Sequence, residues 1–115
     1  MHEITELEVT PIKFKQWRFV DKWDVYCKGY HFIIPKGFKI DFASIPRPFW
    51  VFASPATGLY RKPAAIHDYC YKTKIISRKE ADDLFLENMK FMGVNVIKRN
   101  IIYWAVRIFG KGAYL

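Results

Sequence analysis

Cysteine is scarce in this sequence, and its spacing fits no metal-binding motif. Only two of the 115 residues are cysteine, Cys27 and Cys70. A single pair excludes the dense disulfide framework of small secreted domains and the four-cysteine sites of structural zinc. We expect two reduced, buried thiols, with a bridge between them as the alternative.

Long apolar runs are also absent. No stretch approaches the roughly 18 uninterrupted apolar residues of a membrane span, so we expect no transmembrane segment. The first three residues, Met1, His2 and Glu3, do not begin a signal peptide. Hydrophobic residues make up 51% of the chain and charged residues 26%, as in an ordinary globular domain. We expect one domain over residues 1–115, with a β-rich part in 1–55 and a helical part in 56–115.

Acidic residues are outnumbered by basic ones. The chain has 11 aspartates and glutamates against 19 lysines and arginines, which gives a net charge of +8. The excess lies mainly in residues 61–115, where eleven basic residues stand against five acidic ones. This charge would attract anionic phospholipid headgroups or nucleic acid, and it does not distinguish between the two.

The first half of the chain has the two-residue periodicity of β-strands. Apolar and basic residues alternate in 12–15 and 17–19, which is typical of a half-buried antiparallel sheet. Residues 23–27 and 30–34 flank Lys28 and Gly29, and this arrangement predicts a hairpin that turns at Gly29. Prolines at positions 46, 48 and 55 exclude long regular structure from the loop over residues 41–55.

Two helices with clear start signals are predicted next. Pro63 suits the first turn of a helix, where the N–H that proline lacks would have no partner. Ser77 and Glu80 fit a capping box, so a second helix should begin at Arg78 and end at Gly93. The short connection between the two helices predicts an antiparallel pair.

A third helix is predicted over residues 94–109. Its apolar residues fall along one side: Val96, Ile97, Ile101, Trp104, Ala105 and Ile108. We expect this side to complete the core, with a membrane-surface helix as the alternative. The predicted fold class is therefore α+β, with an N-terminal antiparallel sheet, a proline-rich loop and three helices.

His67 and Asp82 are the main candidates for chemistry. Helical spacing places His67 on the inward face of the first helix and Asp82 at the edge of the apolar stripe of the second, whereas Asp83 faces outward. A buried carboxylate needs a hydrogen-bond donor, which a facing histidine supplies. The pair would fix the tautomer of His67, so that its other nitrogen can take a proton from water. A purely structural hydrogen bond is the alternative.

This arrangement resembles a known enzyme core. His67, Asp68 and Tyr71, followed by Asp82 and Phe85, are similar to the helix pair of the secreted and parvoviral phospholipase A2 enzymes. The resemblance implies that His67 activates water, that Tyr71 and Asp82 support it, and that Asp68 binds calcium. The alternatives are that Asp68 only favours its helix terminus and that Tyr71 only packs.

Calcium is the cofactor that this resemblance implies. The calcium loop of the phospholipases is rich in glycine, because backbone carbonyls must wrap the ion. Residues 54–62 contain a single glycine, Gly58, and end in Arg61 and Lys62, which would disfavour a divalent cation.

A second resemblance covers nearly the whole chain. The segment 34–47, which contains Asp41, Ser44 and Arg47, is followed by the helix of His67 and by Asp82. This order is similar to a family of small uncharacterised domains of bacteriophages and prophages. It implies a phage origin, a location in the host cytoplasm or the virion, and a role for Asp41, Ser44 and Arg47 as binding residues. The alternative is that Asp41 and Ser44 only cap a turn.

Three functions from different classes follow. The first is a lipid or ester hydrolase that acts on anionic phospholipid through water activated by His67. The second is a non-catalytic virion or assembly component that contacts other phage structural proteins. The third is a small protein that binds an anionic ligand or a host factor through its basic half.

Overall fold

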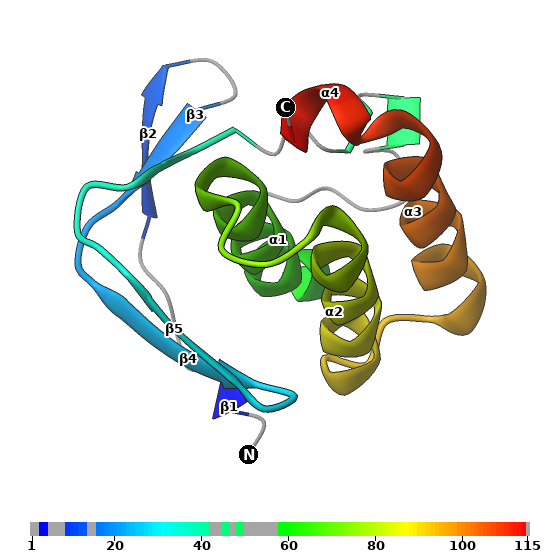
Figure 1. Ribbon diagram of the computed structural model, residues 1–115. Coiled ribbons are helices and arrows are strands. Elements are labelled where there is room, and N and C mark those ends of the chain that lie inside the picture. Colours follow the sequence, from blue (N-terminus) through cyan, green and yellow to red (C-terminus); the bar gives the residue numbers. More distant parts are fainter. Residues whose placement is uncertain are drawn as a thin grey trace. The chain divides into compact units, whose positions relative to one another are not determined.

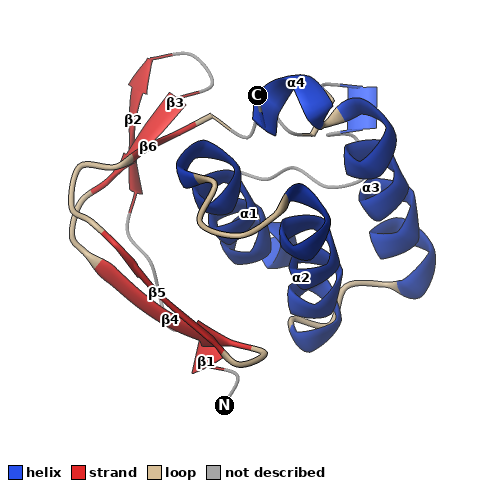
Figure 2. Cartoon of the chain, in the orientation of Figure 1, coloured by secondary structure: helices blue, strands red, loops and turns tan. Residues whose placement is uncertain are grey.

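The computed structural model describes residues 3–4, 9–13, 16–41, 45–46, 48–49 and 58–114. The chain divides into two compact units, Met1–Asp41 and Phe42–Leu115. The described strands belong to the first unit and the described helices to the second (Figure 1, Figure 2). The single domain predicted from the length of the chain stays a prediction.

The first unit consists of short antiparallel strands. Among the described residues these are β1 (Glu3–Ile4), β2 (Val9–Lys13), β3 (Gln16–Phe19), β4 (Trp23–Cys27), β5 (Tyr30–Ile34) and β6 (Lys39–Ile40). They form two three-stranded sheets with the orders β1-β4-β5 and β2-β3-β6. The antiparallel sheet structure predicted from alternating residues is therefore confirmed, and it is divided into two sheets.

The β4–β5 hairpin follows from local sequence. The two strands pair around Lys28 and Gly29, whose φ angles are 46° and 85°. A two-residue turn with two positive φ angles matches the right-handed twist of the strands, and glycine adopts such an angle without strain. Trp23, Val25 and Cys27 alternate with more exposed residues along β4, as expected for a strand with one buried side. The predicted turn at Gly29 is confirmed.

The second unit is helical from Gly58 to Tyr114. Its elements are the 3-10 helix η2 (Gly58–Tyr60) and the helices α1 (Arg61–Thr73), α2 (Arg78–Phe91), α3 (Val96–Phe109) and α4 (Lys111–Tyr114). The three long helices match the three that the sequence predicts, and the short α4 is additional. The α+β class, with strands followed by helices, is confirmed.

Local signals explain where the helices begin and end. Ser77 Oγ accepts a hydrogen bond from the N–H of Glu80 at 3.1 Å, and Glu80 Oε1 accepts one from the N–H of Ser77 at 3.1 Å. The predicted capping box is thus present. Gly93 follows α2 with a φ of 86°, as a left-handed C-terminal residue does. Asn95 caps α3 by accepting from the N–H of Ile97 at 2.9 Å.

The buried side of α3 differs from the predicted one. α3 buries Ile102, Ala105 and Val106, whereas Ile97 and Trp104 are 68% and 58% exposed. At 100° per residue, Ile102 lies about 160° around the helix from Trp104. α3 has apolar residues on both of these sides, so its sequence does not decide which side meets the core. The prediction that the side containing Ile97 and Trp104 completes the core is wrong.

Two smaller predictions concern the cysteines and membrane spans. Cys27 and Cys70 are both buried, so their predicted burial is confirmed, and their reduced state stays a prediction. Within the described ranges, each helix is too short or too polar to cross a bilayer.

Candidate functional site

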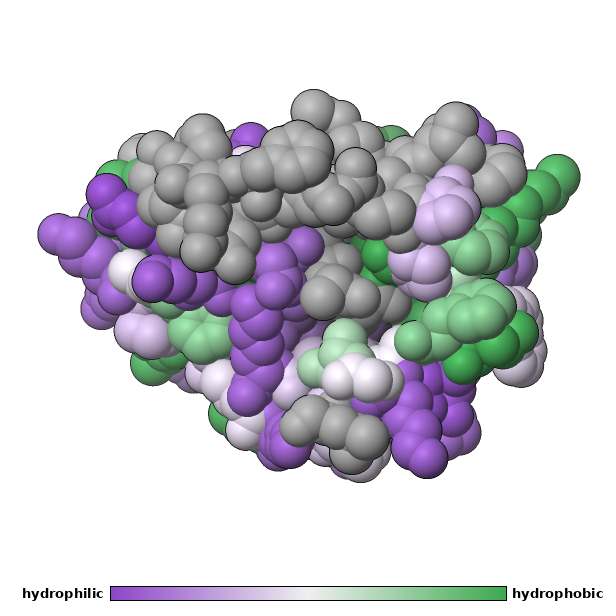
Figure 3. All heavy atoms as spheres, turned by 90° about the horizontal axis from the view of Figure 1, so that it is seen from above, coloured by the Kyte–Doolittle hydropathy of each residue, from purple (hydrophilic) through white to green (hydrophobic). Residues whose placement is uncertain are grey.

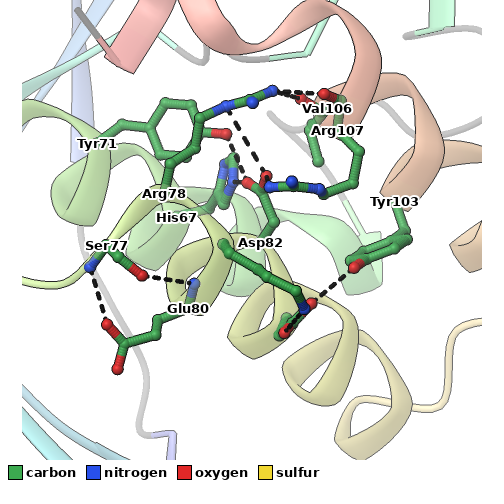
Figure 4. A network of polar contacts seen from close by, with 11 residues as sticks. His67, Tyr71, Ser77, Arg78, Glu80, Asp82, Tyr103, Val106 and Arg107 are labelled. Atoms are coloured by element: carbon green, nitrogen blue, oxygen red, sulfur yellow. Dashed lines mark hydrogen bonds and ion pairs between the residues drawn. The ribbon is translucent and has the colours of Figure 1, made fainter.

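The antiparallel α1–α2 pair brings His67 and Tyr71 to Asp82. The ring of His67 stacks on that of Phe85 with centroids 4.5 Å apart, and Tyr71, one turn later on α1, bonds Asp82, one turn earlier on α2. Contacts that run in opposite directions along two helices show that the helices are antiparallel, as predicted. His67 Nε2 lies 2.6 Å from Asp82 Oδ1, and the Tyr71 hydroxyl donates to the same oxygen at 2.5 Å (Figure 4).

Two arginines complete the surroundings of Asp82. Arg107 on α3 donates from Nη1 to Asp82 Oδ2 at 2.8 Å. Arg78 lies one turn before Asp82 on α2, with Nε 4.0 Å from the same oxygen. Arg78 Nη2 also donates to the carbonyl oxygens of Val106 and Arg107, at 2.7 and 2.6 Å. Three helices therefore meet at one carboxylate (Figure 4).

The sequence alone does not point to these two arginines. Arg78 precedes Asp82 by four residues, and this spacing of an ion pair on one helix face is the one signal in the sequence for its role. Arg107 is 25 residues from Asp82 in the chain, and no local pattern connects the two. Its role depends on how α3 packs against α2.

Burial and hydrogen bonds set the charge states of the pair. The side chains of His67 and Asp82 are both 0% exposed. Burial lowers the pKa of His67, and this effect outweighs the opposite influence of Asp82. Burial alone would raise the pKa of Asp82, but hydrogen bonds from His67, Tyr71 and Arg107 together hold that pKa below its usual value. At neutral pH the imidazole is neutral and the carboxylate is ionised.

These charge states define the tautomer of His67. An ionised carboxylate only accepts hydrogen bonds, so the Nε2 atom of His67 must carry the proton that it shares with Asp82. In a neutral imidazole the other ring nitrogen, Nδ1, then has the lone pair. Burial and the hydrogen bond to Asp82 both raise the pKa of Tyr71, so its hydroxyl stays protonated and donates. This protonation pattern fits a structural hydrogen bond as well as a general base.

Asp68 occupies a different environment from Asp82. Its side chain is 3% exposed, and Oδ2 lies 3.4 Å from Lys72 Nζ, one turn later on α1. Calcium sites are built from several oxygen ligands around the ion. In the part of the chain that the structure describes, no group of three or more histidine, cysteine or acidic residues could hold a metal ion. Residues 54–57 of the predicted calcium loop lie outside the described residues, so calcium binding by Asp68 stays a prediction.

Comparison with known proteins shows where this chain belongs. A family model described as "Protein of unknown function (DUF1353)" matches residues 17–106. The chain is a DUF1353 protein. The matched region includes α1 and α2 with His67 and Asp82, and it ends one residue before Arg107.

A curated relative is similar to most of this chain. The chain is 36% identical over 83 residues to "Uncharacterized protein y4jT" of Sinorhizobium fredii (strain NBRC 101917 / NGR234). The alignment covers 71% of this chain and 25% of the relative, so the DUF1353 chain spans about a quarter of that protein. No solved structure matches.

The structure does not test whether the other predicted binding residues of this DUF1353 chain belong to the site of His67. Asp41 is the last residue of the first unit, whereas His67 and Asp82 belong to the second. Ser44 and Arg47 lie outside the described residues. A shared site of Asp41, Ser44 and Arg47 with His67 therefore stays a prediction. The structure brings together His67, Tyr71 and Asp82, and on the same helix it pairs Asp68 with Lys72.

Proposed function

We propose that this DUF1353 chain is a hydrolase of phospholipids or related esters in which His67 activates water. The observation that carries the proposal is the 2.6 Å contact between His67 Nε2 and Asp82 Oδ1. It leaves Nδ1 as the basic atom of a neutral imidazole. The resemblance to the phospholipase A2 helix pair, with histidine, tyrosine and the second aspartate in corresponding places, supports the same roles.

In the proposed reaction, Nδ1 of His67 removes a proton from a water molecule as that water attacks the ester carbonyl carbon. The resulting imidazolium is stabilised by the ionised Asp82 through the bond at Nε2. Tyr71 donates to the same carboxylate oxygen and restrains its position. The imidazolium then returns its proton to the leaving alkoxide. Because the His67 side chain is 0% exposed, water and substrate reach Nδ1 only when neighbouring groups move.

The proposal includes no step through calcium. Lys72 already neutralises part of the charge of Asp68, and the described residues supply no further set of carboxylate ligands. Calcium remains a variable of the experiment. If activity needs calcium and is lost in Asp68→Asn, the ion binds Asp68 and displaces the Lys72 ammonium group from it.

The test is release of fatty acid from vesicles of mixed anionic and zwitterionic phospholipid, with calcium and with a chelator. We expect His67→Ala to lower the rate by about 100-fold or more, the usual contribution of a general base. His31→Ala is the matched control, because that histidine belongs to the first unit and its side chain is 41% exposed. Circular dichroism and thermal melting must show that both variants are folded.

Absence of activity in the native chain under all these conditions would overturn the hydrolase. An equal rate in the native chain and a folded His67→Ala variant would also overturn it, since the rate would then come from elsewhere. A loss confined to His67→Ala, with His31→Ala at the native rate, supports it.

A structural role for the network is the second candidate, and one observation favours it. Asp82 is completely buried and accepts from three side chains on α1 and α3: His67, Tyr71 and Arg107. Such a network can specify how three helices pack without any chemistry. This reading accords with a non-catalytic virion or assembly component, or with a binding protein for an anionic ligand. The phage origin implied by the sequence pattern is part of this proposal.

A further inference from the structure

The outward side of α3 carries an unusually apolar row of side chains. Ile97, Ile101, Trp104 and Ile108 follow one another at intervals of four, three and four residues, so they lie on one face of the helix. We call them the α3 stripe. Ile97, Trp104 and Ile108 are 68%, 58% and 65% exposed. The green residues at the right of Figure 3 lie on the side where Figure 1 shows α3.

An apolar groove runs beside this stripe. It has a volume of about 400 Å³, and Ile101, Trp104 and Ile108 line it together with Phe49 and Phe109. The rings of Phe49 and Phe109 are 6.2 Å apart, and Phe109 is 60% exposed. Exposed apolar residues are ordinary when they are scattered, but a contiguous row beside an apolar groove indicates a binding surface.

The segment that carries the stripe is basic, and Asp83 of α2 approaches it through Tyr103, whose hydroxyl donates to Asp83 Oδ1 at 2.6 Å. Residues 88–115 contain five basic residues and no acidic residue. Lys98 and Lys111 are exposed and lie near the two ends of the stripe. The partner of this surface should therefore be apolar and anionic at once.

We propose that the α3 stripe docks this protein onto an anionic phospholipid bilayer. The isoleucines and Trp104 enter the boundary between headgroups and acyl chains, the groove beside Phe49 accepts an acyl chain, and Lys98 and Lys111 contact the headgroups. An amphipathic helix with a tryptophan on its apolar side and lysines beside it has this preference. The proposal is independent of catalysis, because a protein can dock without turning over the lipid.

Two other occupants fit the same surface less well. Nucleic acid would satisfy the charge, but its phosphates and sugars offer polar contacts and would leave the exposed Ile97, Ile108 and aromatic rings unused. A second copy would bury the apolar row but would bring together two α3–α4 segments whose charged residues are all basic and repel one another. A bilayer that contains anionic lipid satisfies both features.

The test is co-sedimentation of the full chain with vesicles of pure phosphatidylcholine and with vesicles that also contain phosphatidylglycerol. We expect binding to the anionic vesicles that weakens with salt. The double variant Ile97→Gln, Ile108→Gln should bind at least about tenfold more weakly, because two exposed apolar side chains no longer enter the bilayer. Ile75→Gln is the matched control, since Ile75 is 52% exposed and lies between α1 and α2.

Native-level binding by the double variant would overturn the proposal, as would absence of binding by the native chain at low salt. A native chain that is a dimer, with the double variant a monomer that still binds vesicles, would assign the stripe to a second copy instead. His67→Ala should bind vesicles like the native chain. That variant separates docking from hydrolysis, so failure of either proposal can be recognised without the other.

Discussion

At the scale of single residues, Asp82 is the centre of the described polar network. It accepts from His67, Tyr71 and Arg107, and its side chain has no exposed surface. A carboxylate so deeply buried depends on its partners to offset the loss of hydration. In asparagine an NH2 group would replace one of the two acceptor oxygens, so the donors on that side would face another donor.

Asp82→Asn should therefore destabilise the fold. We expect the free energy of unfolding to fall by about 3 kcal/mol, as when one member of a buried pair is removed. Asp83→Asn is the neighbouring control, because the Asp83 side chain is 47% exposed and its ion pair with Lys79 lies at the surface, so about 0.5 kcal/mol is expected. Urea denaturation measures both. Equal losses in the two variants would contradict a special role for Asp82.

The lowered pKa of His67 predicts a pH dependence of stability. In the unfolded chain the imidazole takes up a proton near pH 6.5, whereas in the folded protein burial opposes protonation. The unfolded state then binds more protons below pH 6.5, so the free energy of unfolding should fall as the pH drops from about 6.5 towards 5. The expected slope is smaller in His67→Gln. Parallel curves for the native chain and this variant would show that His67 does not cause the effect.

At the scale of elements, α3 ends at a glycine, Gly110, that lies against Tyr71. Gly110 follows α3, and its N–H donates to the carbonyl oxygen of Val106 at 2.9 Å. A Cβ atom at Gly110 would overlap that carbonyl and lie 3.0 Å from the hydroxyl oxygen of Tyr71. The absence of a side chain thus lets α3 end against the network of Asp82.

Gly110→Ala should disturb this junction. We expect a loss of about 1–3 kcal/mol, typical of an extra methyl group in a filled site. Gly112→Ala is the control, because a Cβ atom there meets nothing within 4 Å, and that change should be neutral or slightly stabilising. Thermal melting of the two variants decides the matter. A Gly110→Ala protein as stable as the native chain would mean that the Val106 carbonyl and the Tyr71 hydroxyl both move without cost.

At the scale of the whole molecule, the second unit combines most of the positive charge with an exposed apolar surface. The sequence gives the second unit, Phe42–Leu115, most of the net charge of +8. The structure adds that the same unit exposes the apolar α3 stripe. Attraction to anionic surfaces could be predicted from composition, whereas the docking face could not, because it depends on which side of α3 packs inward.

Local sequence determined the elements of this protein. The turn at Gly29, the capping box of Ser77 and Glu80 and the ends of α2 all depend on residues within a few positions of one another, so their spacing is sufficient to predict them. The pairing of His67 with Asp82 was also predictable. A short connection makes the two helices antiparallel, and helical spacing places both residues on the facing sides.

Tertiary structure alone decided the rest. Arg107 reaches Asp82 from 25 positions away, and α3 buries Ile102 and Val106 while it exposes Ile97 and Trp104. Both sides of α3 are apolar, so its periodicity permits either orientation. Packing against α2, which joins residues far apart in the chain, decides between them, and in the observed orientation Arg107 donates to Asp82.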